Sequence, residues 1–338
     1  MIKLIKKKLN PTCYQGAENL SQHFEGWYFK IVDRTENFSY AIIPGICLHH
    51  DNSLRHAFIQ IYDGLNNQSH YVKFPTDSFH CIENKFEINI DSNFFSSERI
   101  VLNIADSTLN VSGELQFSGL CKWPRTIISP GIMGWYTWVP FMECYHGIVS
   151  LNHKIHGSLS INGENIDFSD GVGYTDKDWG KSFPEAWIWF QSNHFSSPNI
   201  CITGSIAIIP WIKKPFLGFI FGLWHDGRLY RFTTYLGAPL VCFGVNNNKV
   251  HFTFEQKQLV LEIRADYMEA CLLQAPTING MTRKISESIN SSLEVKLFSK
   301  SKSKSTIILE DTGRHAGFEI AGDVKRLLEM WRITSRTQ

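Results

Sequence analysis

The stretch from residue 171 to residue 195 holds the side chains best suited to chemistry. It reads GVGYTDKDWGKSFPEAWIWFQSNHF, and seven aromatic residues are interleaved there with ionisable ones such as Asp176, Lys177 and Asp178. An ordinary strand buries its rings and leaves its charges to water. Aromatic and ionisable side chains interleaved within so short a stretch are typical of an apolar pocket that holds a few specifically positioned polar groups.

Two-residue spacing in this stretch predicts which side chains act together. Side chains two residues apart on a strand point to the same face. A strand would therefore place Tyr174, Asp176 and Asp178 on one face and Lys177 and Trp179 on the other.

A second set follows with the same spacing. If residues 186–195 form a strand, Trp187, Trp189, Gln191 and Asn193 share a face. Two indoles and two amides on one face predict a binding surface that lines one cavity with Asp176. Packing into a plain core is the alternative.

Composition bounds the class of protein. The chain has 338 residues, 43% of them hydrophobic, and a net charge of +1, so nothing indicates a nucleic-acid partner. Its eight cysteines lie at least 23 residues apart, which predicts reduced thiols in a cytoplasmic protein and no metal site.

The apolar windows at 127–142 and 215–224 are shorter than a membrane-spanning helix. The basic start MIKLIKKKLN leaves a peripheral membrane contact open, beside a solvated terminus.

The chain repeats itself at an offset of about 160 residues. Five pairs of segments match in the same order: 25–29 with 185–189, 39–44 with 205–210, 61–64 with 223–227, 101–104 with 260–263, and 157–161 with 316–320. Short β-rich runs separated by turn residues fill both copies. We therefore predict an all-β fold of two antiparallel β-barrel domains from an internal duplication, residues 1–170 and 171–338.

One segment has no counterpart in the second copy. Residues 121–147 form an aromatic insert that ends in Glu143, Tyr145 and His146, and six of the ten tryptophans lie between 123 and 189. Loops and domain interfaces often carry ligand sites, so we expect the insert to cover the pocket or to pack at the interface. An aromatic plug that only joins the domains is the alternative.

Several motifs, in the same order over about residues 20–325, give the chain a family resemblance. They are HFEGWYFK at 23–30, PFMECYHG at 140–147, GYTDKDWG at 173–180, SFP at 182–184 and WIWFQ at 187–191 with Asn193 and Phe195. With these motifs the sequence resembles the tocopherol cyclase family, which is similar to carotenoid hydratases and other proteins of two lipocalin-like barrels. Where plant cyclases carry Glu-Lys-Asn-Trp-Gly, this chain has Asp-Lys-Asp-Trp-Gly at 176–180.

The resemblance implies closure of a chromanol ring, in which the phenol oxygen of a prenylated hydroquinone adds across the nearest double bond of its tail. This reaction needs an acid aimed at the alkene, aromatic faces that stabilise the carbocation, and exclusion of water. It requires no metal, nucleotide or redox cofactor.

Candidate roles follow from the resemblance. Asp176 is the first choice for the proton donor, which requires its pKa to lie above the reference value near 3.9. The other assignments are Tyr174 as relay, Glu25 and His146 as bases for the phenol proton, Trp187 and Trp189 as cation-stabilising rings, Gln191 and Asn193 as head-group ligands, and Trp27, Trp179 and Glu143 as further substrate-binding residues.

Other functions remain open for the same residues. A lipocalin-like carrier would need the aromatic pocket but not the acid, and a hydratase would let water capture the carbocation. A third alternative is a pocket that folds a polyene without proton transfer. We expect the protein to be a monomer that binds a hydrophobic small molecule.

Overall fold

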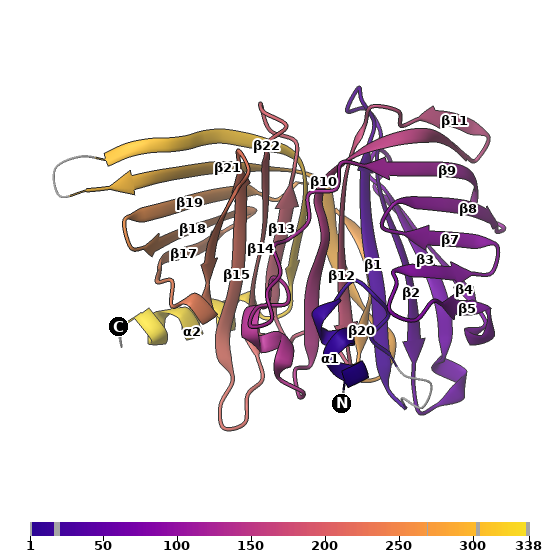
Figure 1. Ribbon diagram of the computed structural model, residues 1–338, viewed down its shortest axis with the longest axis horizontal. Helices are drawn as coiled ribbons and strands as arrows, with labels where there is room; N and C mark the ends of the chain where they lie inside the picture. The colour runs from indigo at the N-terminus through magenta and orange to yellow at the C-terminus, as the bar shows by residue number, and fades with distance from the viewer. Residues whose placement is uncertain (1, 17–20, 269, 302–304, 336–338) are drawn as a thin grey trace. The chain divides into compact units, whose positions relative to one another are not determined.

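The computed structural model describes residues 2–16, 21–268, 270–301 and 305–335, and most of them form antiparallel β-strands (Figure 1). The chain divides into two compact units. Unit 1 comprises Met1–Phe183 and Cys271–Ile285, and unit 2 comprises Pro184–Ala270 and Ser286–Gln338. Each unit is described by itself.

Unit 1 is built on a 12-stranded antiparallel sheet. Its strands follow the order β4-β3-β2-β1-β12-β10-β9-β8-β7-β6-β5, and β11 pairs with β10. They are β1 (His23–Val32), β2 (Ser39–Leu48), β3 (His56–Asp63), β4 (Gln68–Phe74), β5 (Phe79–Cys81), β6 (Glu87–Ile90), β7 (Asn93–Ser96), β8 (Arg99–Ala105), β9 (Asn110–Ser118), β10 (Cys144–Ile161), β11 (Glu164–Asp167) and β12 (Val172–Gly180).

Unit 2 is built on a 10-stranded antiparallel sheet with the order β16-β15-β14-β13-β22-β21-β19-β18-β17, and β20 pairs with β21. Its strands are β13 (Trp187–Ser192), β14 (Ile200–Ile209), β15 (Phe216–His225), β16 (Arg228–Thr233), β17 (Leu240–Asn246), β18 (Lys249–Gln256), β19 (Leu259–Asp266), β20 (Cys271–Thr277), β21 (Gly280–Lys300) and β22 (Ser305–Ala321). β20 and the start of β21 belong to unit 1, where β20 lies beside β3 and β4.

Helices are few and short. They are α1 (Ile2–Leu9), α2 (Val324–Ser335) and four 3₁₀ turns, η1 (Asn52–Leu54), η2 (Thr76–Ser78), η3 (Gly134–Trp138) and η4 (Thr234–Leu236). In the part of the chain that the structure describes, no helix is both long and apolar enough to span a membrane. The prediction of an all-β protein with two antiparallel sheets is confirmed.

Each sheet has one face against a hydrophobic cluster and one face turned away from it. In unit 1, alternate residues of β1 (Trp27, Phe29 and Ile31) belong to the cluster. In unit 2, Ile188 and Phe190 of β13 belong to the cluster. We call the other face of each sheet its non-core face. The period of two along a strand places Tyr28 of β1 there, as it does Trp187 and Trp189 of β13.

The two sheets share one strand order except that the sheet of unit 1 continues with β6 and β5. In each sheet the last strand pairs with the first: β12 with β1, and β22 with β13. The first three of the five repeat matches lie at strands with the same position in both sheets. The last two do not, because 101–104 lies in β8 and 157–161 in β10, whereas their partners lie in β19 and β22.

The division into units differs from the expected boundary at residue 170. β12 lies in unit 1, because it pairs with β1 on one side and with β10 on the other. Local sequence cannot show such pairing, since the partners lie about 150 and 30 residues away.

Candidate active site

Polar side chains gather on the non-core face of unit 1, where β1, β12 and β10 run side by side. In the register of these strands, Tyr28 pairs with Asp176, and Lys30 with Tyr174. Tyr174, Asp176 and Lys30 are at most 2% exposed. A strand face with this many buried polar groups is unusual, because each must be compensated when it leaves water.

Four of these side chains form a continuous chain of polar contacts. Tyr174 donates its hydroxyl proton to Asp176 Oδ2 at 2.7 Å. His146 Nε2 lies 3.8 Å from the same oxygen, and His146 Nδ1 lies 3.0 Å from Asp178 Oδ1. The structure thus brings together three predicted catalytic residues (Tyr174, Asp176 and His146), with Asp178 as a fourth member. A row of phenol, carboxyl, imidazole and carboxyl can hold a proton at several positions and pass it along.

The aromatic insert reaches this row from the loop between β9 and β10. The His146 backbone N–H contacts the Met133 sulfur at 3.1 Å, and Tyr145 donates its hydroxyl proton to Val139 O at 2.5 Å. The insert therefore packs against the strand that carries His146. Whether it also lies at an interface between the units stays a prediction.

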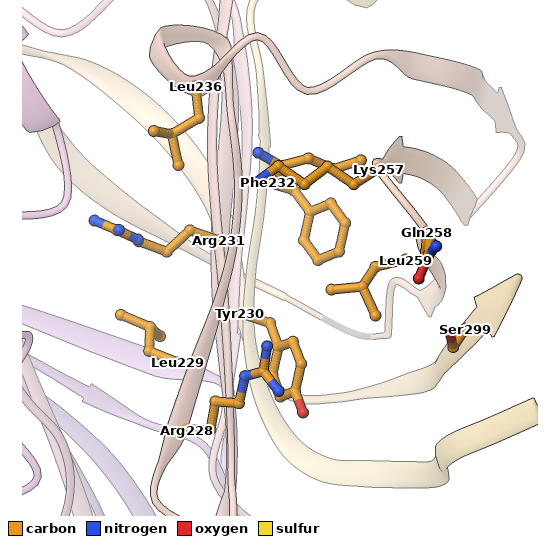
Figure 2. A pocket seen from close by; sticks show the side chains of 11 residues that line it. Arg228, Leu229, Tyr230, Arg231, Phe232, Leu236, Lys257, Gln258, Leu259 and Ser299 are labelled. Carbon is orange, nitrogen blue, oxygen red and sulfur yellow. The ribbon is translucent and has the colours of Figure 1, made fainter.

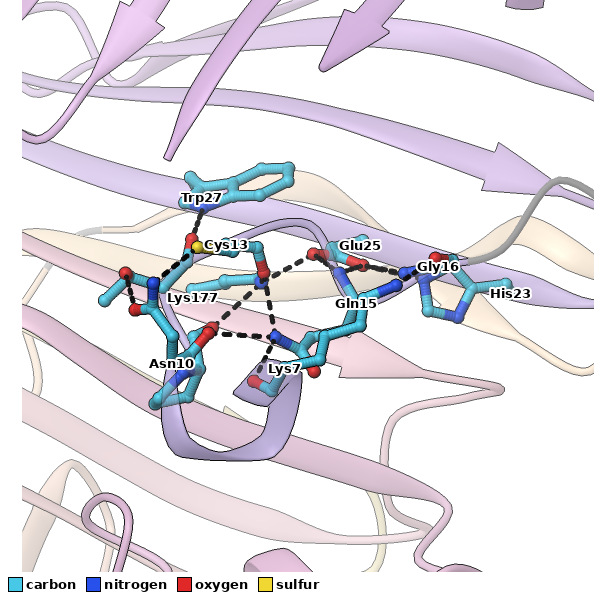
Figure 3. Close-up of polar contacts among 11 residues, drawn as sticks. Lys7, Asn10, Cys13, Gln15, Gly16, His23, Glu25, Trp27 and Lys177 are labelled. Atoms are coloured by element: carbon cyan, nitrogen blue, oxygen red, sulfur yellow. Dashed lines mark hydrogen bonds and ion pairs between the residues drawn. The ribbon is translucent and has the colours of Figure 1, made fainter. Parts of the chain in front are cut away.

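Lys177 lies on the opposite face of β12 from Asp176 and forms its ion pair elsewhere. Its ammonium group lies 2.5 Å from Glu25 Oε1 and donates to the carbonyls of Pro11 (2.9 Å) and Cys13 (Figure 3). It also lies 4.7 Å from the ring centres of both Trp27 and Trp179.

Arg125, the other cation that could have paired with Asp176, donates to Asn10 Oδ1 at 3.1 Å. Asp176 therefore contacts Tyr174 and His146, whereas Lys177 and Arg125 have partners elsewhere.

Glu25 lies on the core side and is surrounded by hydrogen-bond donors. Its carboxylate accepts from His23 Nε2 at 2.8 Å and from the backbone N–H groups of Gln15 and Gly16 at 2.8 to 3.1 Å. Burial alone would raise the pKa of Glu25, but the Lys177 charge and the His23 hydrogen bond lower it below its ordinary value. A carboxylate kept ionised in this way stabilises structure, and it does not share the face of Asp176.

Two further residues of unit 1 that the sequence singled out, Trp27 and Trp179, lie on the opposite face from the Asp176 row. Trp27 is fully buried in the hydrophobic cluster, stacks on Phe86 and donates its indole N–H to Thr12 O. Trp179 stacks on Tyr145 with ring centres 5.4 Å apart. The backbone carbonyl of Glu143 accepts from Lys181 N–H at 2.9 Å.

In unit 2, the predicted binding residues lie on the non-core face of β13. Trp187, Trp189 and Gln191 are at most 7% exposed, and the strand ends at Ser192, one residue before Asn193. Trp187 donates its indole N–H to Glu319 Oε2 at 2.5 Å.

Neither polar atom of the Gln191 amide has a hydrogen-bond partner among the described residues, although the side chain is 0% exposed. Such an amide is costly unless a polar group meets it. Because Asp176 belongs to unit 1 and Gln191 to unit 2, the cavity expected between them stays a prediction.

Sequence reasoning missed several buried polar residues. Glu287 and Glu319 are direct partners across β21 and β22, next to Trp189 in the register. Lys30 lies within the motif at 23–30, yet only the pairing with Tyr174 shows its place. A charged residue inside an apolar strand run, as in GFEIA at 317–321, was the available signal.

A cavity of about 720 Å³ lies within unit 2, between β16 and the turn that joins β18 to β19 (Figure 2). Its lining includes Tyr230, Phe232 and Leu259 together with the cations Arg228 and Lys257. The Arg228 guanidinium lies 4.6 Å from the Tyr230 ring centre. None of the residues that the sequence singled out lines this cavity, and it contains no carboxyl or histidine, so we do not assign the proposed chemistry to it.

The fold resembles that of a protein with a known crystal structure. The crystal structure of CghA with Sch210972 covers 89% of each chain with a TM-score of 0.54, at 9% sequence identity. This likeness shows the same all-β architecture and nothing about the reaction. Among curated proteins, the chain is 27% identical over 206 residues to the chloroplastic tocopherol cyclase of Zea mays, and the match covers 56% of this chain and 41% of the maize protein. The chain therefore spans less than half of that relative's length.

The model of the tocopherol cyclase-like family matches residues 101–322. The matched range includes the Asp176 row and β13. The chain belongs to the tocopherol cyclase-like family, and the resemblance inferred from its motifs is confirmed.

Proposed function

We propose that the protein closes a ring on a prenylated hydroquinone by protonating an alkene of its tail. The observation that carries this proposal is the row Tyr174–Asp176–His146–Asp178, in which Tyr174 and Asp176 are buried and which lies inside the family match. Asp176 donates its proton to the alkene and leaves a tertiary carbocation. The phenol oxygen then forms the new C–O bond, and the phenol proton returns to the row, so the product is an isomer of the substrate.

The contacts support one assignment of roles within the row. Tyr174 orients the Asp176 carboxyl through its hydrogen bond. His146 lies between two carboxyls, so it can accept the phenol proton and return it to Asp176. Glu25, the other predicted base, is already held by Lys177 and His23, and we assign it a structural role.

Unit 2 carries the groups that we assign to binding. The rings of Trp187 and Trp189 can stabilise a cation, by about 2 kcal/mol when water is excluded. The amide of Gln191 offers both a donor and an acceptor that a phenolic head group would satisfy.

The proposal is tested by incubating the purified full chain with a prenylated hydroquinone and following substrate and product by mass spectrometry. Ring closure gives a product of unchanged mass that has lost one phenol and one alkene. A product heavier by one water would show a hydratase instead. Tight binding with no product under any condition would show a carrier.

A further inference from the structure

The loop between β9 and β10 presents an apolar tip to water. Thr126 N–H donates to Ser129 O at 2.9 Å, and Ser129 N–H donates to Thr126 Oγ1 at 3.0 Å, which closes a tight turn. Ile127 and Ile128 occupy the centre of this turn and are 76% and 77% exposed. Turn centres normally carry Gly, Pro, Asn or Asp. The conformation of the turn therefore does not explain why two exposed isoleucines occupy its centre.

The tip is held in place by the rest of the insert. Trp138 donates its indole N–H to the Ile127 carbonyl at 3.0 Å. Pro124 and Pro130 flank the turn and restrict its backbone. Further apolar side chains of the insert are exposed as well, with Trp135 at 43% and Phe141 at 50%.

Basic residues lie on the insert itself and on α1, which contacts the insert. Lys8 of α1 donates to Thr137 O at 2.8 Å, and the Arg125–Asn10 hydrogen bond joins the loop to the end of α1. Residues 1–16 contain four lysines, residues 119–142 contain Lys122 and Arg125, and neither segment has an acidic residue. In a chain whose net charge is only +1, this is a marked separation of charge.

We propose that this basic-apolar face docks on the surface of an anionic lipid bilayer, with the tip of the loop inserted at the boundary between head groups and acyl chains. We define the face by Ile5, Lys6, Lys122, Ile127, Ile128, Trp135 and Phe141. Apolar side chains ringed by lysine and arginine are what such a surface binds, since the acyl region takes the former and anionic head groups attract the latter. A second copy of the chain fits less well, because two such faces would repel each other.

One loop of unit 2 also combines an exposed apolar side chain with exposed lysines. The loop between β14 and β15 reads PWIKKP at 210–215, and its Ile212 is 78% exposed beside exposed Lys213 and Lys214. It corresponds to the polar loop HHDNSLR at 49–55 between β2 and β3, so the duplication does not account for it.

The test is sedimentation of the full chain with vesicles of phosphatidylcholine alone or with about 30% phosphatidylserine. We expect binding only to the anionic vesicles. Replacing Ile127 and Ile128 together by serine should weaken it about tenfold or more. Changing Lys6→Gln or Lys122→Gln should weaken it about fivefold each at low salt, and less at high salt.

The matched control changes exposed apolar residues in two other turns of unit 1. Leu65 and Ile278 are 58% and 59% exposed, and Leu65→Ser with Ile278→Ser should leave vesicle binding unchanged. Equal sedimentation with both kinds of vesicle, or an equal effect of the two serine pairs, would overturn the proposal. So would a loss of self-association in the Ile127, Ile128 variant in the absence of lipid, which would show a protein interface. Because the measurement is binding and not turnover, it does not depend on the proposed reaction.

Discussion

The non-core faces of the two units carry different chemistry. On β12 and β10 of unit 1, Tyr174, Asp176 and His146 form a chain of ionisable groups. On β13 of unit 2, Trp187 and Gln191 present an indole and an amide. In the proposed reaction, one face moves a proton and the other binds an aromatic or cationic centre.

The difference shows which parts of a duplicated fold are free to diverge. Both units keep the same strand order and an apolar core face. The first strands also show how easily faces exchange, since Trp27 and Trp187 align in the sequence repeat but point to opposite faces. Trp27 lies in the core of unit 1, whereas Trp187 points away from the core of unit 2. A shift of one residue along a strand reverses every side chain.

The largest expected effect tests the acid of unit 1. Asp176→Asn should lower turnover by about 10² to 10⁴, because the amide is nearly isosteric but cannot supply the proton. Substrate binding should persist. Trp187→Ala should lower turnover less and weaken binding as well, so the two changes separate the roles of the two faces.

Steady-state and binding assays on both variants check this contrast. Asp170→Asn is the control, because the Asp170 side chain is 75% exposed and pairs only loosely with Arg34. If Asp176→Asn retains full activity, this carboxyl is not the acid.

The second effect tests whether the core side of β12 is structural. Lys177→Met should lower the free energy of unfolding by about 3 to 5 kcal/mol, because it leaves the Glu25 carboxylate buried without its cation. Adding Glu25→Gln should recover part of that loss. Urea unfolding of both variants gives the values. A loss below about 1 kcal/mol for Lys177→Met would mean that the pair does not hold this region together.

A smaller effect of opposite sign is expected in unit 2. Gln191→Met should raise the free energy of unfolding by about 1 to 3 kcal/mol, since it removes two buried polar atoms that lack partners in the described chain. The same change should raise KM by removing a head-group ligand. Gln116→Met, on an exposed position of β9, is the control and should change neither quantity. Unchanged KM would remove Gln191 from the binding face.

The smallest effect concerns a buried histidine of unit 1 that the mechanism does not use. His153 packs against the Phe117 ring, and its two ring nitrogens have no hydrogen-bond partner among the residues that the structure describes. Gly173 makes room for it, because a Cβ there would lie 2.2 Å from His153 Nε2. Burial lowers the pKa of His153 to about 3.

A lowered folded-state pKa gives a defined pH dependence. Above the unfolded-state pKa of about 6.5, the histidine is neutral in both the folded and the unfolded state, so its protonation does not change the free energy of unfolding. As the pH falls from about 6.5 toward 3, only the unfolded chain takes up the proton, so stability falls by up to about 1.4 kcal/mol per pH unit. In His153→Leu, the free energy of unfolding should therefore fall less steeply between about pH 6.5 and 5, by up to about 1.4 kcal/mol per pH unit. Urea unfolding at several pH values measures this slope. Parallel pH profiles for both proteins would contradict it.

Local sequence carried much of the fold and part of the site. The spacing of Tyr174, Asp176 and Asp178 predicted their common face correctly, because alternation is a local property of a strand. The turn between β15 and β16 also has a local signal, because Asp-Gly is a typical hairpin pair and both Asp226 and Gly227 have the positive φ that such a turn needs.

What could not be predicted depends on pairing between distant strands. The Lys177–Glu25 contact joins residues 152 positions apart, and the place of Glu319 beside Trp187 depends on the register of β22 with β13. The motif around Trp27 did not predict which face of the sheet this side chain occupies, because a shift of one residue in the strand register reverses the face.

Ring closure in deuterated water tests the central claim most directly, that an acid of the protein protonates the alkene. Every exchangeable proton of the Tyr174–Asp176–His146 row becomes deuterium, so the cyclised product should carry one deuterium on the carbon beside the new ether centre. Mass spectrometry and NMR of the product locate it, and Asp176→Asn should form this product about 10² to 10⁴ times more slowly. A cyclised product without solvent deuterium on that carbon would contradict the account.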